Sequence, residues 1–86
     1  MEIGQTYLFL TMTFYWTGRL VALNPGEFII EEAAQVFDLG ELENALKTGE
    51  VRLCQAVPDK HRVHIPRSGT TALTWSRPLI RKSKRD

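Results

Sequence analysis

The chain has 86 residues, of which 43% are hydrophobic and 24% are charged, and its formal net charge is +1. This length predicts a single domain, and the ordinary composition excludes collagen-like, coiled-coil and low-complexity proteins. The small net charge conceals an asymmetry. Residues 1–59 carry nine acidic and three basic side chains, whereas residues 60–86 carry eight basic side chains and one acidic one. Such segregation predicts that the basic part binds an anionic partner or contacts the acidic part of a neighbouring copy.

Cysteine content and the N-terminus bear on where the protein is found. Cys54 is the single cysteine, so an intramolecular disulfide is excluded and a reducing compartment is expected. Residues 1–3 lack the basic region that opens a secretory signal. The apolar run over residues 7–16 is interrupted by two threonines and is too short to cross a bilayer as a helix. We therefore expect a soluble protein made in the cytoplasm, without a membrane partner.

A first strand is predicted over residues 6–16, which are rich in aromatic and β-branched side chains. Alternation along a strand divides these residues between two faces. The even positions form a fully apolar face, consisting of Leu8, Leu10, Met12, Phe14 and Trp16. The odd positions form an amphipathic face, consisting of Tyr7, Phe9, Thr11, Thr13 and Tyr15. One face of the strand is therefore expected in the core.

Further short strands are predicted over residues 19–23, 28–31, 51–57, 62–65 and 70–75. Turns are expected at Thr17-Gly18 and at Asn24-Pro25-Gly26, where glycine would take the positive φ of a type II turn. Many short strands joined by tight turns predict a mainly β fold, a small SH3-like barrel of five to six antiparallel strands.

One short helix is expected after the third strand, over about residues 39–48. Asp38 and Glu41 have the spacing of a capping box, and several leucines then fall on one helical face. Gly49 follows, where a left-handed residue would end the helix. Residues 33–37 fit either the end of a strand or a helical turn.

The barrel is expected over residues 1–78, followed by a basic tail over residues 79–86. The basic residues singled out as partner-binding candidates are Arg77, Arg81, Lys82, Lys84 and Arg85. They would contact either nucleic-acid phosphates or an acidic protein neighbour. A solvated tail without a partner is the alternative.

Two stretches of the sequence resemble the conserved blocks of Sm-like proteins. "TGRLVALNPGEFIIEEA" is similar to their first block, a strand–turn–strand unit, and "VHIPRSGTTALTW" is similar in outline to their second. In that family an Asp and an Asn in the first-block loop bond uridine. Here the Asp position is Asn24, and no second Asn follows. The resemblance implies an SH3-like barrel.

The order of segments also resembles small uncharacterised proteins of tailed phages and prophages. The shared features are an opening "YLFLTMT" strand, the "TGRLV" segment, a helix ending in "ALKTG", then "VPD" and a late tryptophan. This resemblance implies a component of a virion or of its assembly, with no catalytic role.

Candidate catalytic and metal-binding residues do not form a plausible site. His61, His64 and Cys54 are the only soft metal ligands, and a His-x-x-His pair on a strand places its rings on opposite faces. Cys54 lies mid-strand, where a small buried thiol is the usual occupant. Glu31 and Glu32 are adjacent on a strand, so they point to opposite faces and cannot act together. We therefore predict no enzymatic activity, no cofactor, no metal and no small-molecule substrate.

Tyr7, Phe9 and Tyr15 are candidates for a protein interface, because they share a face and aromatic residues are enriched at interface cores. The alternative is that these rings belong to the barrel core. Arg19 is the only basic residue in that region, which disfavours base stacking beside phosphates. The sequence thus predicts a non-enzymatic assembly module of a phage particle or similar large complex, in contact with copies of itself or with other subunits. The alternative function is an Sm-like oligomer that binds RNA or DNA through its basic C-terminal part.

Overall fold

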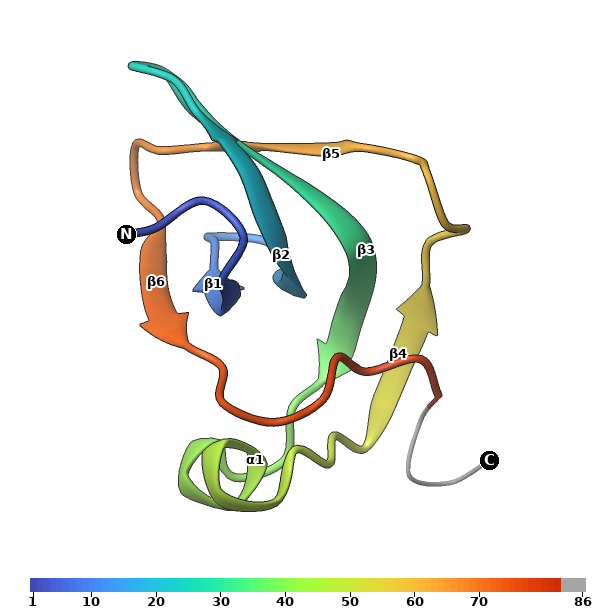
Figure 1. The fold of residues 1–86 in the computed structure, drawn as a ribbon. Coiled ribbons are helices and arrows are strands. Elements are labelled where there is room, and N and C mark those ends of the chain that lie inside the picture. The colour runs from blue at the N-terminus through green and yellow to red at the C-terminus, as the bar shows by residue number, and fades with distance from the viewer. Residues whose placement is uncertain (83–86) are drawn as a thin grey trace.

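The computed structural model describes residues 1–82, and this part of the chain forms six strands and one short helix. In chain order the strands are β1 (Thr6–Leu10), β2 (Tyr15–Leu23), β3 (Glu27–Asp38), β4 (Leu53–Ala56), β5 (Val63–Pro66) and β6 (Thr71–Thr74). The helix α1 (Leu42–Thr48) lies between β3 and β4 (Figure 1). The predicted mainly β fold, with its helix inserted after the third strand, is confirmed.

All six strands belong to one antiparallel sheet in the order β4-β3-β2-β1-β6, and β5 also pairs with β3. The long strand β3 pairs with three other strands. One of its edges pairs with β2, and its other edge pairs with β5 and β4 in turn. Residues 27–30 pair with β5, and residues 34–38 pair with β4. Glu32 has a φ of 52° and lies between these two stretches, where the strand changes partner. Residues 33–37, which fitted either strand or helix, are therefore strand.

The first predicted strand is interrupted by a hairpin turn at residues 11–14. The Thr11 backbone N–H donates to the Phe14 carbonyl (3.3 Å), and the Thr11 hydroxyl oxygen accepts from the Phe14 N–H (3.1 Å). Threonine hydroxyls offer the backbone such local bonds in competition with a strand ladder. The aromatic residues around the turn masked this signal in the sequence pattern.

Gly18 lies inside β2 and does not form the predicted turn. The register of β2 against β3 shifts next to it, between Thr17 and Arg19. A Cβ atom at Gly18 would lie 2.7 Å from Ile30 Cδ1 and 3.2 Å from the Glu31 carbonyl oxygen. Glycine is therefore required here because β3 approaches the backbone closely.

Three local predictions about turns and caps have different outcomes. Gly49 ends α1 with a φ of 77°, and its N–H donates to a carbonyl of the last turn (2.8 Å), as expected. Gly26 lacks the predicted positive φ, although the turn that contains it forms. The capping box is also absent, because Asp38 ends β3 and its carboxylate accepts from the Gly40 N–H, while Glu41 makes no side-chain cap bond.

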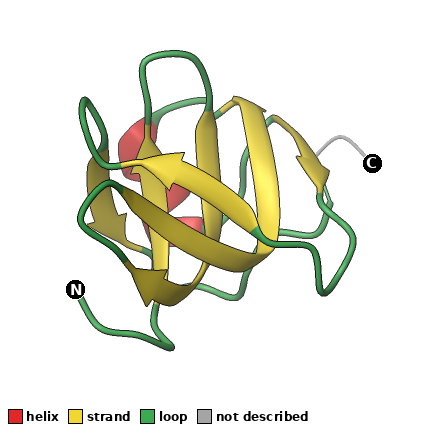
Figure 2. Cartoon of the chain, turned by 90° about the horizontal axis from the view of Figure 1, so that it is seen from above, coloured by secondary structure: helices red, strands yellow, loops and turns green. Residues whose placement is uncertain are grey.

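The sheet is covered on both faces around β1, where two apolar clusters lie on opposite sides of this strand. The helix-side core consists of Leu8, Ala34, Val36, Leu39, Ala45, Val51, Trp75 and Ile80. The β5-side core consists of Tyr7, Phe9, Leu20, Phe28, Ile30, Ala33 and Ile65. In Figure 1, β5 passes above β1 and β2, and α1 lies below them. Seen from above in Figure 2, the helix lies behind the strands.

This double coverage overturns the predicted division of the first strand into a core face and an amphipathic face. Leu8 lies in the helix-side core, while Tyr7 and Phe9 lie in the β5-side core, and all three are buried. Met12 and Phe14, expected on the core face, are 91% and 45% exposed, because they belong to the hairpin turn. Alternation separates core from solvent only where a strand has one solvated side.

The C-terminal strap, residues 75–82, continues the domain beyond the predicted boundary at residue 78. It leaves β6 and runs below β1 and β2 toward β4 in the view of Figure 1. Ile80 is 5% exposed in the helix-side core, and Leu79 packs against that core. At the start of the strap, the Trp75 N–H donates to the Thr6 carbonyl (3.0 Å). Residues 79 and 80 are thus core residues and not part of a solvated tail.

Candidate interaction surface

Two of the three aromatic residues predicted at an interface are core residues. Tyr7 is 8% exposed and Phe9 is fully buried, with its ring 5.3 Å from that of Phe28. The Tyr7 hydroxyl oxygen accepts from the Glu2 N–H (2.8 Å). Neither ring can reach a partner while the β5-side core is intact, so this prediction is corrected for both. Tyr15, which is 37% exposed, is the member of the set that is accessible.

Arg81 is the most engaged of the predicted basic residues. Its Nη2 donates to the Val57 carbonyl (2.7 Å), and its Nη1 donates to the Ala33 carbonyl (3.3 Å). The same guanidinium pairs with Asp59 at 3.1 Å. These bonds join the end of the strap to the β3–β4 region, so Arg81 acts within the fold.

The other basic candidates differ in position. The Arg77 Nε donates to the Lys47 carbonyl beside the end of α1 (2.6 Å). Lys82 is exposed, and Lys84 and Arg85 lie outside the described residues. Because both arginines bond backbone carbonyls, the described part of the strap gives little support to a phosphate-binding tail.

Two carboxylates of β3 have partners from the basic part of the chain. Strand β5, from the basic part, pairs with β3, from the acidic part. Arg62 Nε lies 3.0 Å from Glu31 Oε1, and His64 Nδ1 lies 2.8 Å from Glu27 Oε2. Exposed pairs of this kind contribute only ~0–1 kcal/mol each. They nevertheless give the carboxylates of β3 local partners, which weakens the expectation of a contact between acidic and basic parts of neighbouring copies.

Part of the sheet exposes large apolar side chains among the described residues, and we call this part the open face. It is formed by Phe14, Trp16, Gln35, Phe37, Leu53 and Gln55, on the β5 side of β2, β3 and β4. β5 pairs with residues 27–30 of β3 only. β4 pairs with residues 34–38 of β3, beyond the stretch with which β5 pairs. In this part of the described structure, Phe14, Phe37 and Leu53 are each 45% exposed.

Strand register places Trp16, Gln35 and Gln55 of the open face on one side of the sheet. Trp16 lies opposite Gln35, and Gln35 lies opposite Gln55, so these three form a row across the sheet. Trp16 packs against the β5-side core, which identifies the side on which the row lies. Phe37 lies at the bulge near the end of β3, and its ring meets that of Phe14 edge-on, at 6.0 Å and 80°.

The open face is aromatic at its centre and polar at its border. Phe14, Phe37 and Leu53 are each 45% exposed, and Met12 projects beside them from the hairpin turn. None of the six residues is charged. The face continues into a groove of about 250 Å³, whose lining includes Met12, Phe14, Trp16, His64, Pro66 and Thr70. Contiguous apolar surface of this kind on a small protein commonly marks an interaction site.

The sequence pattern does not predict this surface. It places Phe14 and Trp16 on the apolar face expected in the core, and residues 33–37, which include Phe37, fit either a strand or a helical turn. The available signal was the pair of threonines at positions 11 and 13. A turn there ends the first strand early and exposes the residues that follow it.

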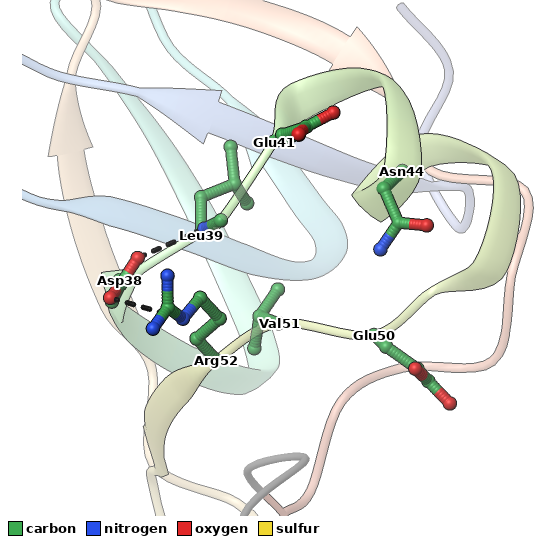
Figure 3. Close-up of a pocket in the computed structure, with 8 residues that line it drawn as sticks. Asp38, Leu39, Glu41, Asn44, Glu50, Val51 and Arg52 are labelled. Carbon is green, nitrogen blue, oxygen red and sulfur yellow. Dashed lines mark hydrogen bonds and ion pairs between the residues drawn. The ribbon is translucent and has the colours of Figure 1, made fainter.

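A second hollow, of about 1030 Å³, lies between the start of α1 and the start of β4 (Figure 3). Its apolar lining is Leu39 and Val51, and its polar lining is Asp38, Glu41, Asn44, Glu50 and Arg52. Arg52 turns toward Asp38, with which it pairs at 3.7 Å, while Glu41 and Glu50 point away from that pair. The carboxylates diverge, so the hollow does not have the geometry of a paired acid–base site.

The remaining candidates for chemistry do not converge on a site. Within residues 1–82, no group of three or more His, Cys, Asp or Glu side chains is placed to hold a metal ion. Cys54 is half-buried in β4 and packs against the helix-side core. No helix in the described range has both the length and the apolar character needed to cross a membrane.

Comparisons with protein family models, with curated proteins and with solved structures found no match to this chain. Function is therefore inferred from the residues and their arrangement. In this arrangement, the open face is the candidate site for binding a partner.

Proposed function

We propose that this protein is a non-enzymatic assembly subunit, a component of a phage particle or of a similar large complex, that acts through protein contacts at its open face. One observation carries the proposal: Phe14, in the hairpin turn before β2, Phe37 in β3 and Leu53 in β4 are each 45% exposed. An aromatic centre with a polar border is the usual anatomy of a protein interface. The phage setting is taken from the order of segments in the sequence alone, because the comparisons with known proteins found no match.

The energetics favour a contact of moderate strength. With a Phe side chain at roughly 200 Å², the exposed parts of Met12, Phe14, Phe37 and Leu53 amount to about 400 Å². Burying this surface contributes about 10 kcal/mol at ~25 cal/mol per Å². Association itself costs about 4–15 kcal/mol. The face is therefore suited to a weak pairwise contact that gains strength when several subunits assemble.

A protein partner is favoured over nucleic acid by the placement of the arginines. Arg77 and Arg81 bond backbone carbonyls of the fold. The open face itself offers aromatic and amide groups without a cation that would track phosphates.

Site-specific photo-crosslinking in the cells that make the protein tests the proposal. A photoreactive amino acid is placed at position 37, in the open face, or at position 23 as a matched control. Leu23 is 41% exposed and lies at the opposite end of β2. We expect illumination to join position 37 to a protein, in higher yield than position 23. Equal yields at the two positions, or no protein adduct at position 37, would refute the proposal.

A further inference from the structure

We infer that the outer edge of β6 is a second contact surface, at which an extended segment of a different protein adds to the sheet as a further strand. The inference rests on the proposed function, because a subunit of a large assembly contacts neighbours on more than one side. β6 ends the sheet order β4-β3-β2-β1-β6, so it lies at the opposite end of this order from β4, at the left in Figure 1.

The backbone of β6 directs part of its hydrogen-bonding groups away from the sheet. In an antiparallel ladder, alternate residues direct both of their backbone groups to the neighbouring strand. The Trp75 N–H donates to the Thr6 carbonyl (3.0 Å), so the odd-numbered residues of this segment bond to β1. The N–H and C=O groups of Ala72 and Thr74 therefore point outward, and within residues 1–82 no further strand pairs with them.

This edge lacks the features that normally prevent a strand from pairing with another protein. Natural edge strands are protected by charged residues, prolines or bulges. Residues 70–75 contain no charge and no proline, are rich in threonine, and pair with β1 without a shift of register. By contrast, β5 contains His64 and ends at Pro66, and Arg62 comes just before it. The edge of β6 is thus the better template for an added strand.

Both cores reach β6, where they end in apolar side chains that are only partly covered. Leu73 packs against the helix-side core and Ala72 packs against the β5-side core, and both are half-buried. A strand added beyond β6 would lie about 4.8 Å away and place its side chains beside these two. In strand addition, backbone bonds give affinity and alternate side chains give specificity. The partner that fits is an extended, uncharged segment with an apolar side chain on each face.

A different protein is favoured over a second copy, because this chain offers β6 no strand better than β6 itself. The edge of β5 ends at Pro66, which has no N–H to donate, and after β4 the Val57 carbonyl already accepts from Arg81 (2.7 Å). Two β6 strands would share only the bonds of Ala72 and Thr74, too few to offset the freedom lost on association. A longer segment of a neighbour that is already held elsewhere in the assembly does not meet this limit.

Amide hydrogen exchange of the purified full chain tests whether the edge is free. We expect the Leu73 N–H, which bonds to β1, to be protected at least ~100-fold more strongly than those of Ala72 and Thr74. Equal protection of the three amides in a dilute sample would show that the edge is covered within one copy. Protection that appears only at high concentration would assign the edge to a second copy. Either result would overturn the inference.

Photo-crosslinking in the cells that make the protein tests the pairing itself. A photoreactive amino acid at position 71, at the exposed start of β6, should join a different protein. Thr74→Pro should lower the yield about tenfold or more, because it removes an outward N–H that the ladder to β1 does not use. Thr74→Lys, which adds a charge at the edge and keeps the bonds to β1, should lower it as well. Leu23→Lys, at the exposed end of β2, is the matched control and should leave it unchanged.

Urea titration shows whether each variant is folded, and Thr74→Lys decides the test where Thr74→Pro is not. The absence of a protein adduct at position 71 is incompatible with strand addition. So is an adduct whose yield neither substitution at Thr74 changes. An adduct of twice the monomer mass would contradict the assignment to a different protein.

Failure of this inference can be distinguished from failure of the proposed function by the adduct at position 37. If position 37 crosslinks to a protein and position 71 does not, the open face is a contact surface and the edge of β6 is not. If Thr74→Lys lowers the yield at position 71 alone, the two surfaces act separately, as inferred. If no protein joins either position, both proposals are wrong.

Discussion

Replacing Ile80 with alanine tests whether the C-terminal strap is part of the core. Ile80 is 5% exposed, so nearly all of its side chain is removed from water. The substitution deletes a methylene and two methyl groups, each contributing about 0.8 kcal/mol when buried, and the cavity left behind adds to the loss. Measured costs of such changes are about 2–5 kcal/mol. Because the strap can settle onto the sheet, we expect the lower part of this range, about 2–3 kcal/mol.

This loss is large relative to the expected stability of the domain. At 0.05–0.15 kcal/mol per residue, a chain of 86 residues has a free energy of unfolding of roughly 4–13 kcal/mol. Urea titration followed by tryptophan fluorescence measures the change. With a slope of about 1–2 kcal/mol per molar, the midpoint should fall by about 1–3 M.

The matched control is Leu23→Ala, at a position that is 41% exposed, which should cost less than about 1 kcal/mol. The opposite result is equally informative. If Ile80→Ala changes the free energy of unfolding by less than about 0.5 kcal/mol, the strap is a solvated tail and the packing described for it is wrong.

Three further substitutions test the packing of β2 and the attachment of the strap, each by the same urea titration. Gly18→Ala should lower the free energy of unfolding by about 1–3 kcal/mol, because the new Cβ would lie 2.7 Å from Ile30 Cδ1. Gly26→Ala is the control and should be nearly neutral, because a Cβ at Gly26 would meet no atom within 4 Å. Thr17→Val should raise the free energy of unfolding by about 1 kcal/mol, because the buried Thr17 hydroxyl has no hydrogen-bond partner among the described residues. A lower free energy of unfolding would show that this hydroxyl is hydrogen-bonded. Arg81→Met keeps the aliphatic stem and removes the carbonyl bonds, so it should cost about 1–2 kcal/mol; no change would mean that these bonds are replaced by water.

The candidate surface was less predictable than the fold, for a physical reason. Local patterns report which residues are apolar, but a half-exposed Phe14 and a fully buried Phe9 look alike in sequence. The difference arises because β5 covers one half of β3 and leaves the other half open. Tyr15, predicted at an interface, is 37% exposed, while Phe14 and Phe37 are each 45% exposed.

The C-terminal strap illustrates the same limit. The sequence after Pro78 is dominated by basic residues, and this composition predicts a solvated tail. The apolar pair Leu79-Ile80 was the contrary signal, but two residues are too few to indicate packing without knowledge of the cavity they fill. The sheet, α1 and Val51 together form that cavity, from segments far apart in the chain.

The sequence by itself determined the mainly β class, the position of the helix and its left-handed end at Gly49, because turn residues, β-branched runs and helix termini act over a few neighbouring residues. Only the tertiary structure decided that β1 is covered on both faces and that Glu31 of β3 pairs with Arg62, the residue before β5. It also decided that β2, β3 and β4 share an uncovered aromatic face. These properties depend on which strands become neighbours, and β3 pairs with β5 residues that lie 33 to 39 positions away in the chain. Local propensity carries no information on such pairings, which depend on the packing of segments far apart in the chain.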